Sequence, residues 1–155
     1  MAYTIRGLDS REFTHLFGQD ERYLALHLAV RKRADKNAGF PDRIALRDVP
    51  EGEYAILVNH AYQPAATPYS GRHAIYIHEG CTTQGVYQDE VPAYLTTRLL
   101  SLRAFNAAHM IITAEVTPGS EAEPLILQML RQPETAYIHV HSARFGCYLC
   151  VIERS

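Results

Sequence analysis

The sequence lacks any long apolar segment. A membrane-spanning helix needs about 20 consecutive apolar residues, and the longest apolar runs here have only the length of a strand or a core helix. The first residues, Met1 to Arg6, lead directly to Asp9 and Glu12 without the apolar stretch of a signal peptide. We therefore expect no membrane association and a cytoplasmic location.

The sequence also has few cysteines and no excess of positive charge. The chain has three cysteines, Cys81, Cys147 and Cys150, an odd number that favours a reducing compartment over a disulfide framework. Its 15 Lys and Arg residues are outnumbered by 17 Asp and Glu residues. Because phosphate contacts need a concentrated basic surface, we expect no nucleic-acid partner. The one basic run, 31–33, is predicted to be a solvated face.

Several well-known motifs are missing too. The sequence has no glycine-rich phosphate loop, dinucleotide fingerprint or nucleophile elbow. What it has is 155 residues, of which 47% are hydrophobic and 21% charged, as in an ordinary folded protein. This length predicts a single domain over 1–155 that buries its own core without a disulfide or a metal.

The hydrophobic pattern predicts an α+β fold. The expected strands are 2–7, 43–46, 54–60, 73–78, 110–116 and a hairpin over 137–152, with 54–60 central in its sheet. The expected helices begin at Asp9, Asp20, Pro92 and Ser120, and the third carries Leu95, Leu99 and Leu102. Since strands and helices do not alternate, we predict one mainly antiparallel sheet with about four helices around it.

Three irregular segments separate these elements. Turn clusters are predicted over 35–41 and 80–88. The segment 61–72 is predicted to be a loop of about a dozen residues, and loops of that length often bind ligands. It contains Tyr69, which we take as a candidate ligand contact.

The last hairpin has the clearest chemical pattern. Strict alternation places Tyr137, His139 and His141 on one face of a strand, with Ile138 and Val140 on the other. Two imidazoles that are two residues apart on one strand face can share a ligand.

Two roles are open for this imidazole pair. As metal ligands, they need at least one more protein donor, for which the candidates are His60, His73, His78 and Glu79. Without a metal, they could serve as general acid and base while arginines hold an anionic group. The candidate arginines are Arg43, Arg72, Arg98, Arg103 and Arg144. The pattern leaves the cofactor open.

The spacing of Cys147 and Cys150 resembles a redox or zinc motif. In a strand, however, residues three apart face opposite sides. We therefore predict two buried apolar thiols, with Cys147 as a weaker candidate for a nucleophile because it follows Gly146 close to the histidines.

A set of short motifs resembles a known family. The motifs are Gly39-Phe-Pro41-x-Arg43, Gly52-Glu53, Pro68-Tyr69, His73-Ala-Ile-Tyr76, Ser101-Leu-Arg103-Ala-Phe105 and His139-Val-His141-Ser-Ala-Arg144-x-Gly146-Cys147. Together they resemble the domain of unknown function 1203 family of bacterial proteins over nearly the whole chain. In that family a cysteine commonly stands where this chain has Asp42, and an asparagine where it has Ser142.

The resemblance implies a bacterial single-domain protein and transfers no catalytic role, and the departure at Asp42 argues against cysteine chemistry there. It does emphasise a set of polar residues, namely Arg43, His60, Tyr69, His73, Arg103, His139, His141 and Arg144.

We expect a small-molecule pocket at one edge of the sheet. In this hypothesis His139 and His141 are the catalytic or metal-binding groups of a hydrolase or group-transfer enzyme. The ligand contacts would come from Arg43, His60, Tyr69, His73, Arg103 and Arg144. The alternative is a non-catalytic binding or interaction module, in one version a homodimer, with structural histidines. Convergence of the histidines and a distant polar residue in one pocket would distinguish the two.

Overall fold

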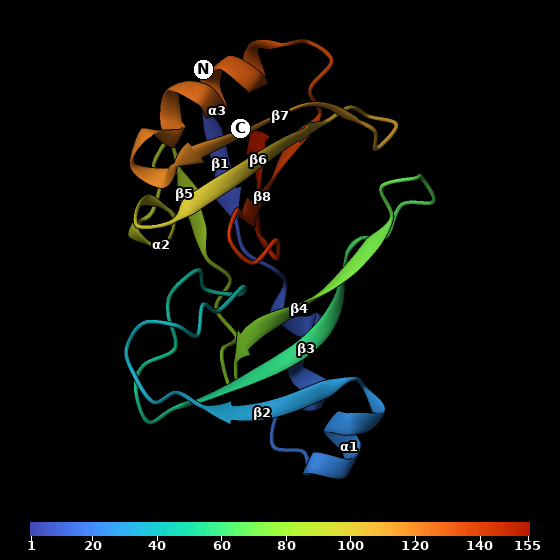
Figure 1. Ribbon diagram of the computed structural model, residues 1–155, viewed down its shortest axis with the longest axis vertical. Coiled ribbons are helices and arrows are strands. Elements are labelled where there is room, and N and C mark those ends of the chain that lie inside the picture. The colour runs from blue at the N-terminus through green and yellow to red at the C-terminus, as the bar shows by residue number, and fades with distance from the viewer.

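The computed structural model describes residues 1–155 as two antiparallel β-sheets, one above the other in Figure 1. The six-stranded sheet has the order β5-β1-β9-β8-β6-β7 and the three-stranded sheet the order β2-β3-β4. The strands are β1 (Tyr3–Arg6), β2 (Ala29–Arg33), β3 (Tyr54–Gln63), β4 (Gly71–His78), β5 (Val86–Gln88), β6 (Leu99–Phe105), β7 (Ile111–Pro118), β8 (Tyr137–Ser142) and β9 (Tyr148–Arg154). The predicted α+β fold with mainly antiparallel pairing is confirmed, but it has two sheets.

Three α-helices are present, where about four helices were expected. They are α1 (Glu21–Leu26), α2 (Ala93–Thr96) and α3 (Ala122–Arg131), and three 3₁₀ turns accompany them, Ser10–Glu12, Thr14–Leu16 and Gly119–Glu121. The helix predicted from Asp9 is thus a pair of 3₁₀ turns. Asp20 caps α1 as predicted, since its carboxylate accepts from the Tyr23 N–H at 2.8 Å.

The larger hydrophobic core lies between α3 and the six-stranded sheet. Ile126 and Leu130 of α3 are fully buried against Ile138 and Val140 of β8. This packing confirms the predicted inner face of β8, and α3 is the helix predicted from Ser120, although it begins at Ala122. The opposite face of β8, with its two histidines, is therefore turned away from α3.

A second hydrophobic core lies between the three-stranded sheet and the N-terminal turns and α1. Ile56 of β3 and Ile77 of β4 are buried there with Phe13, Leu16 and Leu24 from the N-terminal turns and α1. The strand β3 is central in its sheet, as its continuous apolar run predicted.

The predicted helix from Pro92 is wrong beyond Thr96. The segment Leu99–Phe105 is β6, which pairs with both β7 and β8. Its leucines have one-turn spacing, but Leu100, Leu102 and Ala104 also alternate and are fully buried. Pairing on both sides satisfies the backbone of this segment and overrides the helical pattern.

Smaller corrections concern the three-stranded sheet. Residues 43–46 form a turn, not a strand, and Leu46 has a positive φ of 58°. The basic run 31–33 belongs to the edge strand β2, which was not predicted because its charged residues do not give an apolar strand pattern. The loop predicted over 61–72 is confined to 64–70, because β3 and β4 are longer than expected. In the six-stranded sheet, strand β5 lies within the segment 80–88, for which only a turn cluster was predicted.

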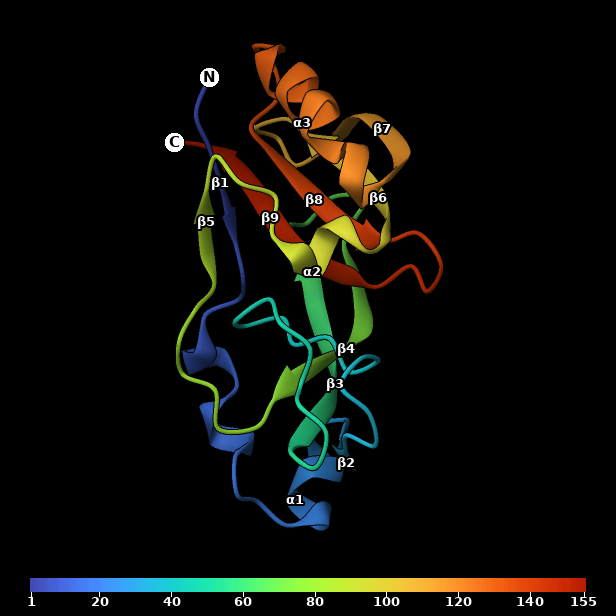
Figure 2. The same ribbon diagram turned by 90° about the vertical axis from the view of Figure 1, so that its left-hand side faces the viewer.

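The two sheets are joined by contacts between distant segments. The Gln63 side chain at the end of β3 donates to the Tyr137 hydroxyl of β8 at 2.9 Å. Figure 2 shows the two termini at the same end of the molecule, where the Ser155 N–H donates to the Ala2 carbonyl at 3.1 Å. These contacts are consistent with one domain. No helix is long and apolar enough to cross a membrane.

A close backbone approach at Gly119 fixes the segment between α2 and β6. A Cβ at this position would lie 1.8 Å from the Leu95 carbonyl oxygen, and the Gly119 N–H donates to the Arg98 carbonyl at 2.7 Å. We expect Gly119→Ala to lower the free energy of unfolding by about 2–3 kcal/mol, because the backbone must move to admit the methyl group. Urea unfolding measures this. Ser120→Ala, at the exposed neighbour, is the control and should cost less than about 0.5 kcal/mol.

Candidate functional site

The two candidate catalytic histidines are buried in an aromatic cluster between the sheets. His139 is 7% exposed and His141 is 1% exposed. The His139 ring centroid lies 4.9 Å from that of Phe105 and 5.1 Å from that of Tyr148, and the His141 ring lies 5.1 Å from Tyr62 of β3. Both rings therefore pack edge-on or tilted against other rings.

This burial keeps both imidazoles neutral. It lowers the pKa of His139 to about 3, with a further contribution from the neighbouring His141, and it lowers the pKa of His141 to about 4. Nδ1 of His141 lies 2.9 Å from the Gly146 carbonyl oxygen, so this nitrogen carries the proton and donates it. Groups with such low pKa values are weak bases at neutral pH.

The predicted third metal ligands do not join the pair. No three His, Cys, Asp or Glu side chains in the structure are arranged to hold a metal ion. Two of the four candidates are engaged elsewhere, since His78 Nε2 lies 3.0 Å from a Glu53 carboxylate oxygen and Glu79 forms an ion pair with Arg31 at 2.7 Å.

The other two imidazoles are also apart. His60 packs against Phe13 with ring centroids 5.6 Å apart and lines a separate cavity with His15 and His27. Burial lowers its pKa to about 4. His73 is half-buried, and its Nδ1 lies 2.9 Å from the Ala74 carbonyl oxygen. The structure thus gives the metal hypothesis no support.

Tyr69 and Arg103 lie near the aromatic cluster. Tyr69, in the loop between β3 and β4, is 38% exposed and packs against Phe105 with ring centroids 6.1 Å apart. Arg103 is opposite His139 in the β6–β8 ladder, and its Nε donates to the Ser101 hydroxyl at 3.2 Å. Neither residue lines a cavity together with the remaining arginines.

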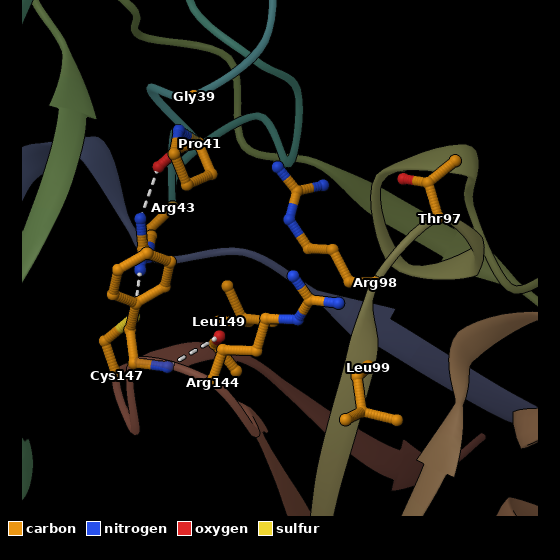
Figure 3. Close-up of a pocket in the computed structure, with 11 residues that line it drawn as sticks. Gly39, Pro41, Arg43, Thr97, Arg98, Leu99, Arg144, Cys147 and Leu149 are labelled. Carbon is orange, nitrogen blue, oxygen red and sulfur yellow. Dashed lines mark hydrogen bonds between the residues drawn. The ribbon is translucent and has the colours of Figure 1, made fainter.

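Arg72 lines the separate cavity of His60, whereas the other three candidate arginines surround a cavity of about 290 Å³ beside the β8–β9 hairpin (Figure 3). Its walls come from the turn before Arg43, the junction of α2 and β6, and the hairpin. The lining residues of interest are Arg43, Arg98, Arg144, Ser142 and Cys147. We call this space the arginine cavity.

Arg43 is the buried member of the set. Its side chain is 1% exposed, and its guanidinium donates to the Tyr148 carbonyl at 2.8 Å, to the Pro41 carbonyl at 2.5 Å and to Cys147 Sγ at 2.9 Å. These bonds connect the turn with β9. They use three of the five guanidinium N–H groups, and no carboxylate forms an ion pair with Arg43.

The adjacent carboxylate of Asp42 does not neutralise Arg43. Asp42 is 1% exposed and accepts from the backbone N–H groups of Ile44, Ala45 and His78 at 2.7 to 3.1 Å. It therefore holds the turn in shape and joins it to β4. The Arg43 guanidinium therefore forms no ion pair with this or any other carboxylate.

The other two guanidiniums extend into the cavity from opposite walls (Figure 3). Arg98 donates to Asp48 at 2.9 Å and lies over the Tyr94 ring, 4.5 Å from its centroid. Arg144, in the hairpin loop, is exposed and forms no hydrogen bond or ion pair within the chain. A positively charged, partly enclosed space results.

The predicted site residues therefore lie in several places. Arg43 and Arg144 share the arginine cavity, His139 and His141 belong to the aromatic cluster with Tyr69 and Arg103 beside it, and His60 lines a separate cavity. The predicted convergence of imidazoles and guanidiniums in one hollow is not found. The contact of Arg43 with Cys147 was missed, and the apolar environment predicted for that thiol is wrong.

The fold and the cavity together define an α+β protein with two antiparallel sheets and an arginine-lined cavity at the ends of the central strands β6, β8 and β9 of the larger one. The chain belongs to the DUF1203 family of proteins of unknown function, whose family model matches residues 39–154. The matched region contains all the residues named above for the arginine cavity. No curated protein and no solved structure matches the chain.

Proposed function

We propose that this protein binds a small anion, a carboxylate or phosphate compound, in the arginine cavity. The observation that supports the proposal most is the buried, unpaired charge of Arg43. Burying an arginine without a counter-charge costs several kcal/mol, and two of its N–H groups remain for a further partner. An anion in the cavity would offset this cost.

The size and shape of the cavity favour a small ligand. Drug-sized ligands occupy roughly 300 to 1,000 Å³, so a space of about 290 Å³ fits a compact compound. Guanidinium groups bind carboxylate and phosphate oxygens in bidentate fashion. Arg144 is free to do so, and Arg98 is held at the opposite wall by Asp48.

The proposal assigns the histidines a structural role. A hydrolase or group-transfer reaction that used His139 and His141 would need a basic ring at the ligand, but both are buried, have low pKa values and lie outside the cavity lining. We therefore propose a binding function, with the aromatic cluster joining the sheets.

Binding is tested with inorganic phosphate and citrate by calorimetry and thermal unfolding. At a ligand concentration of about ten times Kd we expect a rise in Tm of about 3 °C for the wild type. Arg144→Ala should weaken binding about tenfold, because a charge-assisted hydrogen bond to an anion contributes roughly 1.5–3 kcal/mol. This substitution removes no hydrogen bond or ion pair within the fold.

Arg22→Ala is the matched control. Arg22 is exposed on α1, away from the cavity lining, so its loss changes the net charge equally without touching the site. Its affinity for both anions should equal that of the wild type. Equal weakening by the two substitutions, or no binding at all, would contradict the proposal.

A further inference from the structure

One cysteine lines the arginine cavity. Cys147 is 8% exposed and lines the cavity, and its Sγ accepts from Nη2 of the buried Arg43 at 2.9 Å. A thiolate is the nucleophilic form of cysteine, and a neighbouring arginine favours it.

The other two cysteines have no such environment. Cys150 is 0% exposed within the larger core, and burial raises the pKa of its thiol. Cys81 lines a different cavity together with acidic residues such as Asp42 and Glu79, and its Sγ donates to the Thr83 carbonyl at 3.6 Å. Only Cys147 is placed beside guanidiniums and an open space.

From this geometry we infer that Cys147 is a nucleophilic thiol, placed to form a mixed disulfide with a small disulfide that carries carboxylates. The inference rests on the proposed function, because Arg98 and Arg144 would hold the carboxylate of the incoming molecule. The sulfur next to that carboxylate would then lie near Cys147 Sγ.

The reaction is thiol–disulfide exchange. Cys147 loses its proton to solvent, and its thiolate attacks one sulfur of the small disulfide. A new S–S bond forms to that half, the original S–S bond breaks, and the other half leaves as a thiolate that takes up a proton. Cys147 is oxidised and the leaving half is reduced, so no further oxidant is required.

The experiment compares two disulfide probes of opposite charge. The first is the dianionic 5,5′-dithiobis(2-nitrobenzoate), and the second is the dicationic cystamine. Each rate on the native protein is divided by the rate of the same probe with 2-mercaptoethanol, an uncharged thiol. Peptide mapping then identifies the modified cysteine.

We expect Cys147 to be the first cysteine modified by the dianionic probe. Its normalised preference for the dianion over the dication should be about tenfold or more at low salt, a typical size for electrostatic steering into a charged cleft, and should shrink at high salt. Cys81 should show no preference for the dianion. Arg144→Ala should reduce the preference at Cys147 severalfold, and Arg22→Ala should leave it unchanged.

Equal normalised rates of the two probes at Cys147, or earlier modification of Cys81, would overturn the inference. Phosphate and citrate binding to Cys147→Ser separates this failure from that of the proposed function. If that variant binds both anions while the wild-type thiol shows no preference, the binding site stands and the nucleophile is refuted.

Discussion

Replacing Arg43 with methionine should lower the free energy of unfolding by about 3–5 kcal/mol, because two carbonyls, those of Pro41 and Tyr148, lose a charged donor and each unsatisfied buried acceptor costs about 1–3 kcal/mol. Arg43 is 1% exposed, so water cannot easily replace the guanidinium. Methionine also removes the cost of burying a charge, and this change alone would raise the free energy of unfolding. We expect the lost contacts to outweigh it, since they also connect the turn to β9.

Urea and thermal unfolding measure this effect. A loss of that size should lower Tm by about 10 °C in a chain of this length. Arg22→Met, at an exposed position on α1, is the control and should stay within about 0.5 kcal/mol of the wild type. If Arg43→Met remained within about 1 kcal/mol of the wild type, the bonds of this guanidinium would not contribute as described.

Acidification should lower the free energy of unfolding already between pH 6.5 and 4.5, because of His139 in the aromatic cluster. The pKa of His139 is lowered from 6.5 in the unfolded chain to about 3 in the fold. The unfolded state therefore binds a proton first, and stability falls as the pH drops below 6.5. Linkage gives a loss of about 2–3 kcal/mol from His139 alone between pH 6.5 and 4.5.

His139→Phe separates this contribution from the rest. Phenylalanine keeps an aromatic ring among Phe105, Tyr137 and Tyr148, and Nδ1 of His139 has no hydrogen-bond partner to lose. We expect the variant to match the wild type within about 1 kcal/mol at pH 8 and to lose about 2–3 kcal/mol less on acidification to pH 4.5. Parallel stability curves from urea unfolding at pH 8, 6.5, 5.5 and 4.5 would contradict the assignment.

The sequence predicted those helices and strands whose hydrophobic periodicity agrees with the way they pack or pair in the fold. Alternation in 137–142 predicted β8 and its two faces, and the start signal at Ser120 predicted α3, which begins two residues later at Ala122. The segment 99–105 satisfies a helical and a strand period at once, so only its pairing with β7 and β8 decides its structure. Length and charge patterns gave no indication of a second sheet.

The arginine cavity was predictable only in part. The family resemblance drew attention to Arg43 and Arg144, but the partners of Arg43 at the start of β9, Cys147 and Tyr148, are 104 and 105 residues away in sequence. No local pattern specifies such contacts. The expected meeting of histidines and arginines failed because His139 and His141 are covered by aromatic rings, including Tyr62 of β3, and do not line the arginine cavity.

The central claim is that the arginine cavity binds an anion, and crystals soaked in selenate test it most directly. Selenium has a strong anomalous signal, which distinguishes a bound selenate ion from water and from the lighter atoms of the protein. We predict the strongest selenium peak inside the cavity, within hydrogen-bond distance of Arg98 and Arg144, and its loss in Arg144→Ala crystals. Peaks only at other surface arginines, or an unchanged peak in the variant, would contradict the account.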